Sequence, residues 1–383
     1  MALHLLKLKI EYYAMKREYK PKNNELRAKS GHSILCALRP RLIILCLILF
    51  APCSMLFVFS SEAKVTGICS NCHTMHNSQG GTPMAYLDDR LTRAETPYKS
   101  LLVYSCLGCH SSNVAGTWQD AITKAPIVFN TGAPTYGNKG LSAGNFYYVS
   151  ISTDNTGHNI FSTNPDNTLV NTPPGGDALG AQVRCAGKYG CHGQNGSTAV
   201  IDETTAIKGA HHGDDSSIDG STIAKSYRFL LGIIGGEDSD WEKTTSASDH
   251  NIYKGSTAND TSTISYLCAE CHGNFHTWEG GSTEVGSASP WLRHPTDIAL
   301  PGGSTEYAAY NTGPGGSGAY NPLVPLAYSD VSTGHDTSTG GIVACISCHR
   351  AHASPDFKMM RWDYKSWPGS GTNGCGVCHT SKS

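Results

Sequence analysis

Cysteines and histidines recur at a fixed short spacing along this chain of 383 residues. Five stretches have the pattern Cys-x-x-Cys-His, at 69–73, 106–110, 268–272, 345–349 and 375–379. A sixth stretch, RCAGKYGCHG at 184–193, has five residues instead of two between its cysteines. Cys-x-x-Cys-His is the signature of covalent c-type haem attachment. Two thiols add to the two vinyl groups on one porphyrin edge, and the next residue, His, reaches the iron as its proximal ligand.

Zinc binding and disulfide formation are the alternative uses of such cysteines. Neither requires a histidine directly after each second cysteine, which occurs six times here, so the pattern favours haem. The expected attachment cysteines are Cys69, Cys72, Cys106, Cys109, Cys185, Cys191, Cys268, Cys271, Cys345, Cys348, Cys375 and Cys378. The expected proximal ligands are His73, His110, His192, His272, His349 and His379. These sites predict six covalently bound haems.

The second axial ligand of each iron must come from elsewhere in the chain. After residue 63 the chain has nine further histidines but only four methionines, so we expect mostly bis-histidine ligation and low reduction potentials. The candidates are His76, His158, His211, His212, His276, His294, His335 and His352, with one of the 211/212 pair expected to bind. His76 and His352 each follow a proximal histidine by three residues and must therefore reach a different haem. The ninth, His250, lies in the sequence SDHN, which is typical of a surface loop.

The long spacing of the sixth pair leaves two alternatives, haem attachment and a disulfide. The sulfurs of Cys185 and Cys191 must still meet the same two vinyl groups, so the three extra residues must bulge, and Gly187 and Gly190 permit tight turns. Lengthening the loop costs only about 0.8 kcal/mol of chain entropy. A disulfide would leave His192 unexplained, so we favour haem.

The segments between the motifs must position these groups with little regular structure. They are rich in Gly and Pro, and only short apolar runs interrupt them. We expect short strands at 125–130 and 146–152 and a helix or strand at 227–236. About 53 residues per haem are too few for a separate core around each one, so the haems themselves become the core. The predicted fold is mostly coil with short helices and few short strands, wrapped around a stacked haem chain.

The first 63 residues have the features of a secretory signal with a long basic n-region. Basic residues precede the apolar run 42–59, and the small residues Ser61 and Ala63 follow it. An uncleaved anchor is the alternative, and translation could begin at Met15. Losing residues 1–63 takes away ten of the 29 basic and four of the 31 acidic residues and leaves a net charge of −8. That charge excludes a nucleic-acid binder. No later apolar run could span a membrane, so we expect a secreted protein at the outer surface or outside the cell.

Residues 64–383 form one predicted hexahaem domain whose two ends repeat each other. CSNCHTMHNS followed by CLGCH is similar to CISCHRAHAS followed by CGVCH. This similarity indicates a duplicated two-haem unit, with two further sites between the copies.

The order of the landmarks CHTMHNSQGG, GHNI, YRFLLG, CAECHGNFH, LRHP, CISCHRAHAS and CGVCH resembles the OmcS-like outer-surface hexahaem cytochromes of metal-reducing bacteria. The resemblance implies bis-histidine haems, extracellular electron transport and polymerisation into filaments with a continuous haem chain. It also implies that His76 ligates the fifth haem, at His349, of the neighbouring copy. The chain departs from the family at its third site, where CAGKYGCHG replaces an ordinary motif.

Three functions are compatible with the pattern. A non-catalytic electron conduit, as a filament, fits closely spaced and fully ligated irons, with other cytochromes or extracellular metal oxides as donors and acceptors. A monomeric periplasmic carrier has the same chemistry without assembly. A multihaem reductase needs one iron with an open position. The surplus of histidines argues against an enzyme.

Overall fold

The computed structural model describes residues 65, 68–69, 78–79, 82–83, 106–151, 154–161, 172–196, 199–276, 294–300, 306–307, 310, 320–332, 340–366 and 373–380. The chain divides into two compact units, Met1–Ser60 and Ser61–Ser383, and every described residue belongs to the second. The proposed signal segment therefore lies outside the described residues. Among the residues that are described, no helix has the length and apolar character that a membrane crossing requires.

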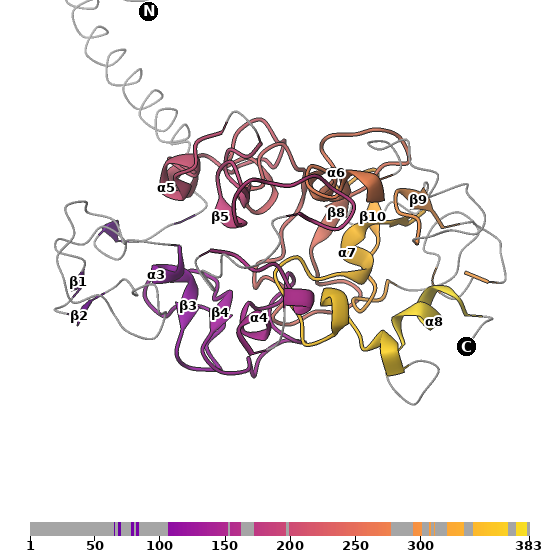
Figure 1. Ribbon diagram of the computed structural model, residues 1–383, viewed down its shortest axis with the longest axis horizontal. Coiled ribbons are helices and arrows are strands. Elements are labelled where there is room, and N and C mark those ends of the chain that lie inside the picture. The colour runs from indigo at the N-terminus through magenta and orange to yellow at the C-terminus, as the bar shows by residue number, and fades with distance from the viewer. Residues whose placement is uncertain are drawn as a thin grey trace, which may run out of the picture. The chain divides into compact units, whose positions relative to one another are not determined.

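Among the described residues of this unit, regular structure is limited to short pieces joined by coil (Figure 1). The α-helices have four to six residues and are α3 Leu107–His110, α4 Tyr147–Ile151, α5 Glu203–Ala206, α6 Ile264–Ala269, α7 Cys345–Cys348 and α8 Gly374–Cys378. Single 3₁₀ turns are η3 Asp154–Thr156, η4 Ala210–His212, η5 Tyr227–Phe229, η6 Gly273–Phe275, η7 Phe357–Met359 and η8 Tyr364–Ser366. The prediction of a mostly coil fold with short elements is confirmed.

The strands that the structure describes are two or three residues long and form one five-stranded sheet and three strand pairs. The pairs are β1 Ser78–Gln79 with β2 Thr82–Pro83, β3 Ser111–Ser112 with β4 Phe129–Asn130, and β5 Arg184–Ala186 with β6 Gly190–His192. The sheet has the order β7-β8-β10-β11-β9, with β7 Gly235–Gly236, β8 Ile252–Lys254, β9 Ile298–Ala299, β10 Ala327–Tyr328 and β11 Ile342–Val343. Only the pairing of β8 with β10 is parallel in this sheet.

The five-stranded sheet separates two apolar clusters. Neighbouring residues of a strand point to opposite faces, so Ala327 and Ile342 join one cluster while Tyr328 and Val343 join the other. Cys348, Cys375 and Cys378 pack against the second cluster. A third cluster, around Leu107 and Phe129, packs against Cys185. The apolar cores therefore lie where the expected haem sites are.

The structure agrees to different extents with the three elements predicted from apolar runs. At 125–130 only Phe129–Asn130 is a strand. The segment 227–236 contains the 3₁₀ turn η5 and the strand β7, so both predicted types occur. The strand predicted at 146–152 was wrong, because Tyr147–Ile151 is the helix α4. At the start of this helix the Asn145 Oδ1 accepts from the Tyr147 N–H at 3.0 Å, and this local bond favours a turn despite the β-forming residues.

Candidate haem sites

Four of the described attachment motifs are built on a single helical turn. In each, the N–H of the histidine donates to the carbonyl of the first cysteine four residues earlier, at 2.8–3.1 Å. A helical turn brings residues i, i+3 and i+4 to one face, so both sulfurs and the imidazole face the same way. The four motifs lie at α3, at the C-terminal end of α6, at α7 and at α8.

The third motif reaches the same arrangement with strands. The parallel pairing of β5 with β6 sets Arg184 beside Gly190 and Ala186 beside His192, so Cys185 lies across from Cys191. Adjacent strands are about 4.8 Å apart, whereas Cβ atoms three residues apart on a helix are about 5–6 Å apart. A spacing of five residues therefore offers two cysteines at a separation close to that of the ordinary motif.

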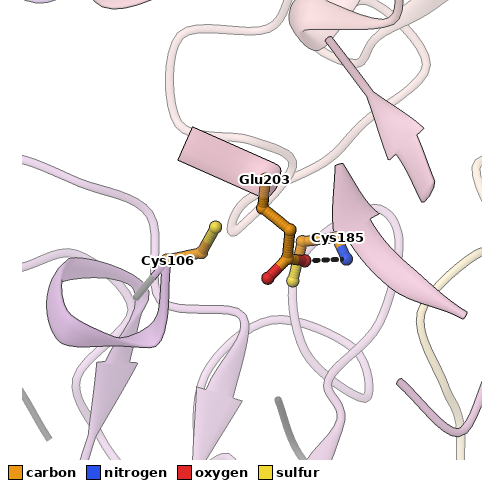
Figure 2. A group of neighbouring side chains, drawn as sticks. All are labelled: Cys106, Cys185 and Glu203. Atoms are coloured by element: carbon orange, nitrogen blue, oxygen red, sulfur yellow. Dashed lines mark hydrogen bonds between the residues drawn. The ribbon is translucent and has the colours of Figure 1, made fainter. Parts of the chain in front are cut away.

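The bulge expected in this motif is present, and glycine makes it possible. Gly187 has φ +86°, in the left-handed region, and a Cβ on Gly190 would lie 2.5 Å from the backbone N of Ala186. The prediction that both glycines permit the turn is confirmed. Glu203 of α5 holds the first strand, because its carboxylate accepts from the N–H of Cys185 at 2.6 Å (Figure 2).

The five described histidines that are expected as proximal ligands are all held through Nδ1, which leaves Nε2 as the atom that could bind an iron. Four of the Nδ1 atoms lie 2.7–2.9 Å from backbone carbonyl oxygens, and His379 Nδ1 lies 2.8 Å from the Glu306 carboxylate. The four carbonyls belong to Pro126, Arg228, Pro174 and Lys358 for His110, His192, His272 and His349 respectively. Such second partners fix the tautomer and orientation of a metal-binding imidazole.

Three proximal histidines lie opposite a second histidine at a nearly constant separation. An imidazole nitrogen binds a transition metal at about 2.0–2.1 Å, and the ring centre lies about 1.1 Å further, so two rings on one iron have centroids about 6.3 Å apart. The observed centroid separations are 6.1, 6.4 and 6.2 Å, for the pairs His158–His272, His192–His352 and His294–His379. These separations fit an iron held between two imidazoles.

Two of these partners, His158 and His294, are also held through Nδ1. Their Nδ1 atoms lie 2.7 Å from the Ala351 carbonyl and 2.9 Å from the Pro295 carbonyl. Burial lowers the pKa of both rings. A neutral imidazole is the form that binds a metal.

Burial has the same effect on His352 and His211. The pKa of His352 is lowered to about 3, mainly by burial and less by the charge of His192. The pKa of His211 is lowered to about 4 by burial and then by the charge of His110, which places these two rings in one neighbourhood. His212 precedes Gly213 at the end of η4 and is exposed.

His276 and His250 differ from what the sequence indicates. His276 Nε2 lies 2.7 Å from the buried Asp297 carboxylate, which engages the nitrogen that an axial ligand would turn to an iron. His250 is buried at 8 % exposure, and its ring stacks on Tyr320 with centroids 3.6 Å apart. The assignment of His250 to a surface loop was therefore wrong.

The first site is mostly outside the described residues. Cys72, His73, His76 and His335 all lie outside them, and Cys69 is described as exposed.

Sulfurs of consecutive sites lie close together in two places. The sulfurs of Cys106 and Cys185 and a carboxylate oxygen of Glu203 all lie within 4.8 Å of one another, which joins the second and third sites (Figure 2). Cys268 and Cys345 hydrogen-bond each other, which raises the pKa of Cys268 and lowers that of Cys345. That bond joins the fourth and fifth sites.

The remaining described junctions follow the same order. Burial, followed by the charge of Cys271, raises the pKa of Cys191 to about 12, so the third and fourth sites are neighbours. Cys348 packs in one cluster with Cys375 and Cys378. The second to the sixth sites thus follow one another in space as they do in sequence.

Two observations indicate that these residues could hold a haem. The arrangement supplies paired sulfurs and paired imidazoles, and the buried Nε of Arg350 has no hydrogen-bond partner among the described residues. Sequence reasoning did not identify the carbonyls that hold the imidazoles, because every residue has a backbone carbonyl. It also did not identify Glu306.

Comparisons with known proteins agree with this chemistry. The family model described as "Doubled CXXCH motif" matches residues 335–383. The C-type cytochrome OmcS of Geobacter sulfurreducens is 27% identical over 371 residues, covering 83% of this chain and 82% of the relative. The outer membrane cytochrome S filament of the same organism matches with a TM-score of 0.40 at 20% identity, covering 79% of this chain and 85% of that one. The OmcS nanowires match with a TM-score of 0.39 at 21% identity, over 84% and 92% of the two chains. In sequence and motif content the chain is similar to the C-type cytochrome OmcS.

Proposed function

We propose that this chain is a secreted hexahaem c-type cytochrome that carries electrons from haem to haem outside the cell, assembled as a filament. The observation that carries the proposal is the set of three histidine pairs at 6.1–6.4 Å, each containing one proximal histidine. Haem supplies a one-electron couple whose potential depends on its axial ligands. The protein supplies attachment, two imidazoles for each iron and a short path between neighbours.

The histidine pairs lead to an assignment of axial ligands. His352 serves the third haem, His158 the fourth and His294 the sixth. For the second haem we propose His211, which lies near both His110 and His192. An iron held by two imidazoles has no open position for a substrate, which favours electron transfer over catalysis.

The order of the attachment sites supports a continuous path. Sulfurs of consecutive sites meet at Cys106–Cys185 and at Cys268–Cys345. The thioether sulfurs lie at the porphyrin edges, so adjacent sulfurs bring adjacent haem edges together. The proposed path therefore connects the second to the sixth sites in the order in which they occur in the sequence.

Assembly into a filament rests on the resemblance of the CHTMH segment and on the filaments formed by the relative. In this proposal His76 ligates the fifth haem of the neighbouring copy, at His349, and joins the haem chains of successive copies. Its acceptors are other cytochromes or extracellular metal oxides.

The experiment compares purified wild-type protein with His76→Ala and with Met75→Ala, a control in the same motif. We expect an intact mass with six haems, a low-spin optical spectrum and filaments in electron micrographs for the wild type and for Met75→Ala. His76→Ala should give monomers with one high-spin haem per chain. A chain without haem overturns the whole proposal, and intact filaments of His76→Ala overturn its assembly.

A further inference from the structure

The side chain of Glu203 lies beside two attachment sites at once. It comes from α5, and its neighbours are Cys106 of the second site and Cys185 of the third (Figure 2). One carboxylate oxygen lies within 4.8 Å of both sulfurs, and the two sulfurs lie within the same distance of each other. One acidic group is therefore shared by two sites that are 79 residues apart in the sequence, from 106 to 185.

The position of this carboxylate is fixed from both sides. Asp202 caps α5, because its side chain accepts from the N–H of Thr205 at 2.7 Å. Glu203 Oε1 accepts from the N–H of Cys185 at 2.6 Å and from that of Ala186 at 3.4 Å. Backbone N–H groups form strong hydrogen bonds with an ionised carboxylate. Glu203 therefore cannot turn away from the two sulfurs without losing its bonds to β5.

No direct ion pair cancels the charge of this carboxylate. In the part of the chain that the structure describes, no lysine, arginine or histidine forms an ion pair with Glu203. Arg184 is a cation of the same region, since its charge adds weakly to the hydrogen bonds, first from Thr205, that lower the pKa of Asp202. Its guanidinium lies over the Phe161 ring, 4.3 Å from the ring centroid. Arg184 therefore offsets the charge of Glu203 only in part and from a distance.

We propose that Glu203 sets the reduction potentials of the second and third haems together. A thioether sulfur lies at the porphyrin edge, so a group close to two such sulfurs lies beside both haems. A negative charge favours the oxidised form of a haem, which carries one more positive charge than the reduced form, so Glu203 holds both potentials lower. This inference rests on the proposed binding of haem, and it adds one residue that adjusts two adjacent haems in the same direction.

The alternative is a purely structural role, in which Glu203 only holds β5 in place. Glutamine separates the two roles, because its side-chain oxygen accepts the same N–H bonds but carries no charge. The structural role predicts that Glu203→Gln leaves the redox titration unchanged. The electrostatic role predicts that two haems move to higher potential.

The test compares Glu203→Gln with the matched control Asp202→Asn, both in the full chain. The control removes the same charge one residue away, from an exposed side chain, and asparagine still caps the helix. Each protein is examined by intact mass, by thermal melting and by an optical redox titration.

We expect six haems in both variants. In Glu203→Gln one third of the absorbance change, that of two haems in six, should move to higher potential. The reduced-to-oxidised ratio of these haems should change about threefold at a fixed potential, equal to about 28 mV. The change is modest because Glu203 is partly exposed and Arg184 offsets part of its charge. The control should titrate like the wild type.

The variant Glu203→Asp keeps the experiment decisive if the glutamine variant loses a haem. Aspartate retains the charge on a shorter side chain, so we expect a lower melting temperature with wild-type potentials. An unchanged titration of a six-haem Glu203→Gln protein, or a shift confined to one haem, overturns the inference. Loss of a haem in both variants assigns Glu203 to folding and overturns it as well. A wild-type chain without haem overturns the proposed function instead, so the two failures are distinguishable.

Discussion

Replacement of Gly190 by alanine tests how the third site is built. A Cβ at this position would lie 2.5 Å from the N of Ala186 and 2.6 Å from its Cα and carbonyl carbon. All three atoms belong to the backbone of the paired strand β5, so they cannot rotate away. Overpacking of this kind costs about 1–3 kcal/mol. The strain would separate β5 from β6 and move Cys185 away from Cys191.

The measurement is the number of haems per chain by intact mass, together with the melting temperature. We expect Gly190→Ala to accumulate as a five-haem protein. Gly196→Ala is the matched control, because Gly196 has φ +81° and nothing within 4 Å of its added Cβ. The control carries only the left-handed strain of about 1–2 kcal/mol. It should keep six haems at a similar loss of stability.

Two results would refute this reasoning. If Gly190→Ala keeps six haems and the wild-type melting temperature, the strand pair does not set the cysteine spacing. If both variants lose a haem equally, general destabilisation and not the geometry of the motif is responsible.

Three other predictions follow from the same geometry. Glu306→Gln removes the carboxylate charge behind His379, so the midpoint potential of the sixth haem should rise by about 59 mV. This shift equals a tenfold change in the reduced-to-oxidised ratio, and an unchanged redox titration curve contradicts it. His158→Ala removes the ring opposite His272 and should convert one haem per chain to high spin in the paramagnetic resonance spectrum, whereas six low-spin haems would exclude the pair. Burial lowers the pKa of His352 from 6.5 to about 3, so the unfolded chain binds the proton first on acidification. The free energy of unfolding should therefore fall as the pH decreases below about 6.5, and urea titrations of His352→Gln should show a weaker pH dependence than the wild type.

The attachment sites could be predicted from the sequence because their geometry is local. One helical turn decides how two cysteines and a histidine face a porphyrin, and that turn is contained in five residues. The unusual third motif was predictable in part, since Gly187 and Gly190 mark a bulge. That the bulge would take the form of two parallel strands was not visible, because the pairing also depends on Glu203 of another element.

The partners of the proximal histidines could not be predicted, because they come from distant segments. His272 is held by a carbonyl 98 residues away, and His158 by one 193 residues away. No local pattern distinguishes His158 from His276, although only His276 faces a buried carboxylate. Tertiary context also contributes to α4, because Asn130 and Tyr136 accept from the Asn145 amide whose Oδ1 binds the N–H of Tyr147.

The contrast between local attachment and distant imidazole partners has a consequence for how the chain folds. Each haem can be joined to its cysteines before any tertiary structure exists, but its second imidazole arrives only when a distant segment docks. In the meantime any nearby histidine can occupy the vacant side of the iron. Refolding of the haem-bearing chain from denaturant should therefore pass through misligated species, with slow phases that shorten when imidazole in solution competes for the irons.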